Sequence, residues 1–528
     1  MQIITFLGFT ILVAVIAYLK TRNTDEDSSD GYFLGGRSLT GVVIAGSLLL
    51  TNLSTEQIVG LNGAAFKEGI LVMAWETLAA IAMVVTAVFL LPRYLKGGIT
   101  TVPQFLESRY DKMTKTITSG LFLSGYAIIL LPIVLYSGAL AINSMFSVPE
   151  MLGVSKNAAL WITVWGIGII GSIYAIFGGL KAVAVSDLIN AIGLLIGGLM
   201  IPFFGLMAIG DGSISDGIST LIETNPEKFN SIGGADSSIP FATIFTGMML
   251  VQLFYWGTNQ AIIQRALGAK NLKEGQKGLL LASFIKILGP LIVVLPGIIA
   301  FHMFGNTLAN PDEAYPMLVT EVLPSYLVGF FAAVLFGAIL SSFNSALNSS
   351  VTLFGIDIYQ SYINKEASEK QVVWAGKKFG IILAIVSMFI APLLIYASDG
   401  LFGYLQEANG IYSIPILTII VVGYLTKFVP AIAAKVGIIS GSVLYIISQF
   451  IIKPAVGAEN YPHFLHVMAI LFVLNIIIML IIGKLRPRAI GYEQVYTKQV
   501  DITPWRYLKV TGIAICVIVI GIYIYFAQ

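Results

Sequence analysis

Long apolar runs separated by short polar segments cover almost the whole chain of 528 residues. Most runs approach the roughly 20 residues that an α-helix needs to cross a bilayer, and Gly, Pro and charged residues mark the breaks between them. The pattern predicts membrane-spanning helices at residues 2–19, 40–62, 69–92, 118–146, 158–177, 184–209, 241–264, 277–303, 325–356, 375–397, 400–425, 430–451, 462–483 and 506–526. We therefore expect an all-α polytopic membrane protein with about 14 transmembrane helices.

Two of the predicted helices contain polar interruptions. The run Thr51–Gln57 lies inside the helix at 40–62, and residues 252–260 interrupt the helix at 241–264, five helices later. Lipid cannot hydrogen-bond such residues, so each run must line a cavity or face other protein. Interrupted helices at corresponding positions of two units are typical of inverted-repeat transporters, whose binding sites form at the breaks. Because five is odd, the two units cross the membrane in opposite directions.

This pattern predicts a 5+5 inverted-repeat core with discontinuous helices and flanking helices on both sides. The expected division is 1–38 for the first helix and a cytoplasmic loop, 39–210 for the first repeat, 211–240 for an external loop, 241–425 for the second repeat and 426–528 for three C-terminal helices.

The basic residues predict the orientation of the chain. Loops that would face the cytoplasm if the N-terminus is outside carry 25 of the 30 Lys and Arg, and the opposite loops carry four. The positive-inside rule then places both termini outside, and we expect a plasma membrane location, as in a bacterial inner membrane. Residues 2–19 lack a preceding basic region, which favours a first span over a cleaved signal peptide.

Composition excludes several other classes of protein. The chain is 57% hydrophobic and 11% charged, which leaves no stretch for a separate soluble domain. The net charge of +2 argues against a nucleic-acid partner, and the single Cys, Cys516, excludes an intramolecular disulfide. No nucleophile–base pair or metal triad is recognisable at membrane depth, so we do not expect an enzyme. No obligate protein partner is evident.

Few ionisable residues fall within the predicted spans, and two of them form a candidate site. Counting 1.5 Å per residue, Glu76 lies roughly 10 Å below the outer face and Lys286 about as far above the inner face, so we expect a polar ligand to bridge the gap that a Lys side chain leaves. The simpler interpretation is a structural ion pair between two helices. A neutral ligand suits such a pair best, because the opposite charges cancel and offer both donors and acceptors.

A second candidate site lies in the predicted helix at 325–356, where residues 341–350 are rich in Ser and Asn. Small hydroxyl residues can simply permit close helix packing. As a set they also supply hard oxygen ligands for sodium, together with carbonyls freed where the helix at 40–62 loosens near Leu50 and Leu53.

Ordered motifs along nearly the whole chain resemble the sodium/solute symporter family and its sodium-coupled sugar cotransporter branch, most closely the bacterial sodium/galactose symporter. These motifs are residues 31–38, 52–60, 101–105, 177–180 with Asp187, 255–265, 295–297 and 348–359. The resemblance implies a LeuT-like fold and sodium-coupled uptake of a neutral sugar, a hexose, by alternating access.

The resemblance also implies roles for individual residues. The sugar contacts would be Gln57, Glu76, Gln252, Lys286 and Gln406. The inner gate would be Tyr255, hydrogen-bonded toward Asn52, and the outer gate would be Leu61, Trp75 and Phe402. Gln252 stands where the galactose symporter has Asn, so the identity of the sugar is open.

Sodium would bind the carbonyls of Leu50, Leu53 and Ala338 and the hydroxyls of Ser341 and Ser342. A second sodium, or the sodium exit path, would involve Asp187 and Ser345.

Two alternative functions compete with sugar transport. The first is a sodium symporter of the same fold for an amino acid, sialic acid or another carboxylate, which the negative charge of Glu76 disfavours. The second is a channel or sodium-activated sensor, which a pocket closed by aromatic gates disfavours. We expect a small-molecule sugar, sodium and the lipid bilayer as the partners of this chain.

Overall fold

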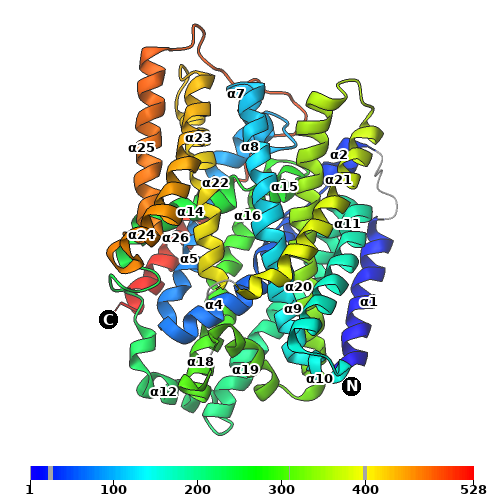
Figure 1. Ribbon diagram of the computed structural model, residues 1–528, viewed down its shortest axis with the longest axis vertical. Helices are drawn as coiled ribbons and strands as arrows, with labels where there is room; N and C mark the ends of the chain where they lie inside the picture. Colours follow the sequence, from blue (N-terminus) through cyan, green and yellow to red (C-terminus); the bar gives the residue numbers. More distant parts are fainter. Residues whose placement is uncertain (1, 22–27, 309, 397–400, 528) are drawn as a thin grey trace.

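The computed structural model describes residues 2–21, 28–308, 310–396 and 401–527. These residues form a bundle of long helices (Figure 1), and their one β-type pairing is a single parallel bridge between Leu39 and Ala269. The helices of the bundle are α1 (Gln2–Thr21), α3 (Gly41–Asn52), α4 (Thr55–Glu68), α5 (Ala74–Val85), α6 (Leu91–Lys96), α8 (Lys112–Gly125), α9 (Leu131–Phe146), α11 (Lys156–Ile209), α14 (Met249–Gly257), α15 (Gln260–Leu267), α16 (Leu272–Ile287), α17 (Gly289–Val293), α18 (Leu295–Phe304), α20 (Ser325–Thr352), α21 (Glu369–Ile390), α22 (Leu401–Leu425), α23 (Ala431–Ile447), α25 (Phe464–Leu485) and α26 (Leu508–Tyr525).

Shorter helices cover the two ends of the bundle. In Figure 1, α10 (Val148–Leu152), α12 (Ile214–Thr224) and α19 (Ala314–Val322) lie at one end, and α2 (Ser29–Leu34) and α7 (Val102–Arg109) lie at the other. The first group belongs to loops that the sequence places outside, and the second group belongs to loops that it places in the cytoplasm. The grouping of these loops agrees with the predicted alternation of the spans.

The described chain accounts for the predicted number of spans. It has 11 helices long and apolar enough to cross a membrane, or up to 13 if each of two bent pairs is one span. One of the eleven, Thr55–Lys96, is interrupted at Gly69, which has φ +77°. With each bent pair counted as one span the total is 13. Dividing Thr55–Lys96 at Gly69 into the spans α3–α4 and α5–α6 adds one more, which gives the expected fourteen. The ends of the predicted helices 375–397 and 400–425 fall on residues 397–400, outside the described part of the chain.

Two details of the helices differ from the sequence pattern. The predicted helices 158–177 and 184–209 are joined without a loop as α11, which turns at Gly179 (φ +58°). The predicted helix 277–303 is bent by 50° between Leu272–Lys286 and Gly289–Phe304. Pro290 stands in the first turn of α17. An N–H there has no acceptor within the helix, so the missing N–H of proline costs no hydrogen bond. The sequence pattern does not predict this bend.

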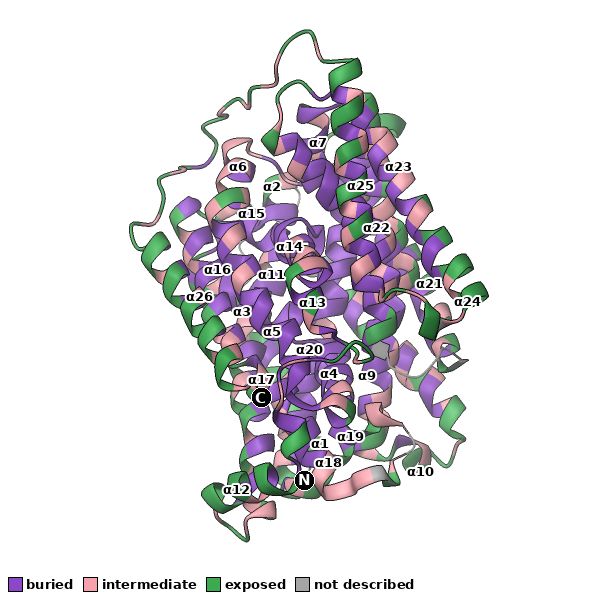
Figure 2. Cartoon of the chain, turned by 90° about the vertical axis from the view of Figure 1, so that its left-hand side faces the viewer, coloured by how far each residue is buried: buried purple, intermediate pink, exposed green. Residues whose placement is uncertain are grey.

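Burial separates a central group of helices from a peripheral group. The span Ser325–Ile363, which includes α20, is 78% buried within the protein, whereas the span containing α1 is 11% buried and the one containing α26 is 22% buried. Figure 2 shows the same contrast, with α4, α5, α14 and α20 in the buried centre and α26 at the exposed edge. The two interrupted helices of the sequence analysis are therefore central.

Both predicted interruptions are present. The backbone between α3 and α4 is extended at Ser54 (φ −86°, ψ −179°), and α14 and α15 are separated by a 47° bend at Thr258 and Asn259. Asn259 caps α15 through Oδ1, which accepts the N–H of Ala261 at 3.0 Å and the hydroxyl of Tyr126 at 2.8 Å. A buried helix end needs such partners for its unpaired N–H groups.

Candidate functional site

Hydroxyl groups of α20 lie directly against the break between α3 and α4. The Ser342 hydroxyl donates to the Thr51 carbonyl at 2.9 Å. The Thr51 hydroxyl lies 3.0 Å from the Ser345 hydroxyl and 3.5 Å from that of Ser341. The structure therefore brings the Ser-rich part of α20 and the polar run of α3 together.

The carbonyls that the sequence assigns to sodium lie at the same place. α3 ends with the bond from the Leu53 N–H to the Leu49 carbonyl, and within the described residues no backbone N–H donates to the Leu50 or Leu53 carbonyl. Ala338 is fully buried in the same apolar cluster as these two leucines, and it lies one turn from Ser341 on α20. Unpaired carbonyls beside hydroxyls form a neutral oxygen site, which suits a monovalent hard cation.

Asp187 and Arg265 form a buried network behind this break. The Ser47 hydroxyl donates to Asp187 Oδ2 at 2.6 Å and accepts from Arg265 Nε at 3.3 Å. Arg265 also donates to the Ser345 hydroxyl. The two residues suggested for a second ion or an exit path are therefore already linked to a guanidinium.

The sequence pattern does not predict this role of Arg265. The residue falls among the basic residues of a loop expected in the cytoplasm, whereas the structure buries its side chain completely at the end of α15. The nearest signal in the sequence is the pair Gln264–Arg265 directly after an interrupted helix. A cation at that position can be buried only if it has partners, which the hydroxyls of α3 and α20 provide.

Glu76 and Lys286 form a direct ion pair with both side chains 1% exposed. Lys286 Nζ lies 2.6 Å and 2.5 Å from the two carboxylate oxygens of Glu76 and 5.8 Å from the centre of the Trp256 ring. The direct pair agrees with the simpler interpretation of a structural ion pair, and a pair bridged by a solute stays a prediction. The bend after Lys286 brings Gly289 against Glu76, and a Cβ at Gly289 would collide with the carboxylate.

Both ends of the Gln252 amide bond to neighbouring protein groups. Its Nε2 donates to the Trp75 carbonyl at 2.9 Å, and its Oε1 accepts from Trp256 Nε1 at 3.2 Å. Gln252 therefore ties α14 to the start of α5, close to the charged pair. In this conformation its amide positions Trp75, and its contact with a solute stays a prediction.

The predicted outer gate residues lie together. The rings of Trp75 and Phe402 pack edge to face with centroids 5.1 Å apart, and Leu61 is fully buried in the same cluster. Gln406 is buried one turn after Phe402 on α22, so both side chains lie on the same face of that helix.

The polar run retains several buried atoms with no hydrogen-bond partner among the described residues. They are Asn52 Oδ1, Thr55 Oγ1, Glu56 Oε2 and Gln57 Oε1. The hydrogen bond from Asn52 to the inner-gate residue Tyr255 stays a prediction. Buried polar atoms in native proteins are nearly always paired, so this concentration of free acceptors marks a place prepared for a polar ligand or water.

Comparison with known proteins agrees with this arrangement. The family model described as "Sodium:solute symporter family" matches residues 32–441. An Escherichia coli protein described as an uncharacterized symporter, YidK, is 50% identical over 523 residues, covering 99% of this chain and 90% of its own. The sodium/glucose cotransporter of Vibrio parahaemolyticus is 32% identical and covers 83% of this chain and 84% of its own. Human sodium/myo-inositol cotransporter 2 is 29% identical and covers 83% of this chain and 68% of its own.

Solved structures show the same fold. A sodium-coupled sialic acid symporter in a substrate-bound, outward-open state superposes with a TM-score of 0.78 at 21% identity, covering 94% of this chain and 99% of its own. Mhp1, a nucleobase-cation-symport-1 family transporter, superposes with a TM-score of 0.55 at 15% identity, covering 86% of this chain and 95% of its own. These neighbours have the LeuT-like architecture that the two interrupted helices predict, and the named relatives are transporters rather than enzymes. The chain therefore belongs to the sodium:solute symporter family.

Proposed function

We propose that this chain couples the inward movement of sodium to the uptake of a neutral sugar. The observation that carries the proposal is the buried Glu76–Lys286 pair, which we place in one solute site with the free acceptor of Gln57. The pair has no net charge and offers both donors and acceptors, which suits a polyhydroxyl solute better than an ion. The glucose and myo-inositol cotransporters among the relatives support a polyhydroxyl substrate.

The proposed sodium site connects the ion to the solute through one helix. Sodium would bind the Leu50 and Leu53 carbonyls, Ala338, Ser341 and Ser342, and the same break leads directly to Asn52 and Gln57. An ion that orders the break would thereby order the solute contacts of α4. Linkage then requires that the solute strengthen sodium binding by the same factor.

In the proposed cycle the outer gate closes before the inner gate opens. Sodium would favour the outward-open state, and the bound solute would allow Trp75 and Phe402 to close over it. Loss of sodium to the cytoplasm would loosen the contact between Asn52 and Tyr255 and release the solute. Each ligand drives the cycle only as far as it binds one state better than the other.

Proteoliposomes test the proposed coupling. We expect uptake of a hexose to follow an imposed inward sodium gradient and to disappear when potassium replaces sodium. A panel of hexoses, myo-inositol, sialic acid and amino acids as competitors identifies the substrate class. Uptake that is indifferent to sodium, or competition by carboxylates alone, would contradict the proposal.

Loss of the outer aromatic pair should weaken solute retention. Trp75→Ala removes the edge-to-face contact with Phe402 and opens the pocket to water, so we expect the KM for solute to rise about threefold to tenfold. Uptake measured against solute concentration checks this value. Trp374→Ala, which removes a 59% exposed ring, is the matched control and should leave the KM unchanged. Equal effects of the two substitutions would contradict a gate role for Trp75.

A further inference from the structure

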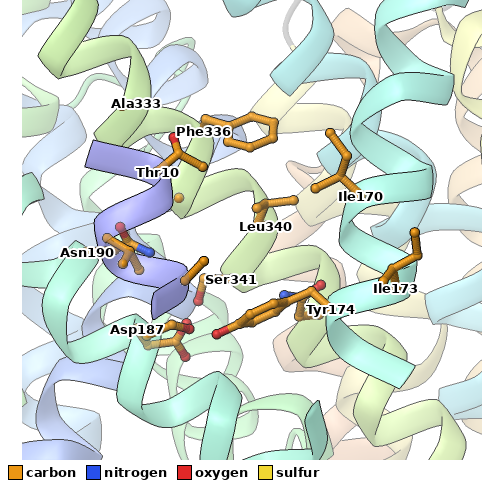
Figure 3. Close-up of a pocket in the computed structure, with 15 residues that line it drawn as sticks. Thr10, Ile170, Ile173, Tyr174, Asp187, Asn190, Ala333, Phe336, Leu340 and Ser341 are labelled. Carbon is orange, nitrogen blue, oxygen red and sulfur yellow. The ribbon is translucent and has the colours of Figure 1, made fainter. Parts of the chain in front are cut away.

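A pocket of about 240 Å³ lies between α1, α11 and α20, away from the proposed solute contacts. Figure 3 shows the Tyr174 hydroxyl, Asp187 and Ser341 gathered at one end, with Ile170 and Ile173 on the opposite wall. Its other lining residues include Thr10, Ala14, Asn190, Phe336, Leu340 and Asn344. The pocket therefore has a polar floor and an apolar wall.

The pocket faces the surface that lipid covers. Ile170 is 50% exposed and Ile173 is 58% exposed, and Ala14 on the peripheral helix α1 is also exposed. The floor residues Asp187, Asn190 and Asn344 are all buried. A molecule dissolved in the bilayer would thus meet the apolar wall first and the polar floor last.

Three hydroxyls that line the pocket can act only as hydrogen-bond acceptors. Thr10, Tyr174 and Ser186 donate their hydroxyl hydrogens to the carbonyls of Phe6, Ala182 and Val183, at 2.9, 3.2 and 2.9 Å. A hydroxyl has one hydrogen, so these three groups can offer only lone pairs to an occupant.

Two further acceptors lie in the floor, which also contains the amide of Asn190. One is the Asp187 carboxylate. The other is Asn344 Oδ1, which has no hydrogen-bond partner among the described residues even though the residue is only 1% exposed. An unpaired buried acceptor beside a carboxylate calls for a group that donates several hydrogen bonds. A primary ammonium, with three N–H donors and one positive charge, fits this set.

We propose that this pocket binds a small lipophilic primary ammonium that enters from the bilayer. Its N–H groups would bond to Asp187 and Asn344, and its apolar chain would pack on Ile170, Ile173 and Phe336. A volume near 240 Å³ equals about eight water molecules, which accommodates the head and a short chain. Because Ser341 lines this pocket and belongs to the proposed sodium site, the bound ammonium would weaken sodium binding.

Thermal unfolding of the purified protein in lipid nanodiscs tests binding directly. Octylammonium at saturating concentration should raise the Tm by about 2 °C or more, because a ligand of the native state stabilises it. Octyltrimethylammonium has the same chain and charge but no N–H donor, and it should have no such effect. Equal effects of the two probes would overturn the proposal, since they would reflect partition into the bilayer.

A pair of substitutions on α1 localises the effect. Ala14→Trp fills the pocket and should abolish the response to octylammonium, whereas Val15→Trp places the same ring on a neighbouring lipid-facing position outside the pocket and should preserve it. A full response in Ala14→Trp would place the site elsewhere. Both variants are compared without the probe, so a loss of folding is recognised separately.

Sodium competition tests the connection through Ser341. Saturating sodium, compared with potassium, should weaken octylammonium binding about fivefold or more. An unchanged affinity would overturn the shared role of Ser341. None of these readouts requires transport, so they remain decisive if the proposed sugar uptake fails.

Discussion

Lys286→Met will abolish sodium-driven solute uptake. The substitution leaves the Glu76 carboxylate 1% exposed and without its cation, and breaking a buried pair in this way costs about 3–5 kcal/mol. It also removes the donor that the proposed solute would use. We expect uptake to fall by about 100-fold or more, measured as the initial rate in proteoliposomes, and the Tm to fall as well.

A double variant separates the solute role of the pair from its structural role. Glu76→Gln combined with Lys286→Met removes both charges while it keeps similar side-chain volumes, so the Tm should return close to the wild-type value. Uptake should remain absent, because the charged donors and acceptors of the solute site are still missing. Recovery of both properties would show that the pair only joins α5 to α16.

Loss of two hydroxyl ligands will weaken sodium activation. In the double variant Ser341→Ala, Ser342→Ala, we expect the sodium concentration for half-maximal uptake to rise about 100-fold or more, since each of the two oxygens bonded to a charge contributes about 1.5–3 kcal/mol. The Thr51 carbonyl accepts from the Ser342 hydroxyl at 2.9 Å in the wild-type protein. In the variant this carbonyl loses its donor, which would add to the disorder of the break. Sodium titrations at fixed solute concentration provide the measurement.

Ser350→Ala is the matched control for the sodium site. Ser350 is equally buried on α20, but its hydroxyl donates to the Ala346 carbonyl at 2.8 Å within the helix. Its removal should leave sodium activation unchanged. A similar shift in the control and in the double variant would mean that α20 packing, rather than ion ligation, sets the sodium requirement.

The sequence predicted the interrupted helices because polar residues at membrane depth have few stable arrangements. Thr51–Gln57 and residues 252–260 both mark real breaks, and Glu76 does meet Lys286. The bend after Lys286 was not predicted, because Gly289 and Pro290 fall within an otherwise continuous apolar run. Without that bend, the depth of each residue suggested a gap between the two charges.

The hydrophobic pattern could not predict the burial of Arg265 or the hydrogen bonds of Gln252. Both depend on which side chains from distant helices arrive at one point: Ser47 and Ser345 for the guanidinium, and Trp75 and Trp256 for the amide. Hydrophobic periodicity gives the number and depth of helices, but it carries little information about their rotation or their neighbours.

The neutrality of the Glu76–Lys286 pair has an electrical consequence. A solute site without net charge adds nothing to the charge that moves during the proposed cycle, so each turnover would carry only the charge of the sodium it transports. A membrane potential of 100 mV then contributes about 2.3 kcal/mol for each sodium, which corresponds to about 50-fold in the solute gradient the transporter can sustain. The membrane voltage, and not only the sodium gradient, would therefore set how far this protein concentrates its solute.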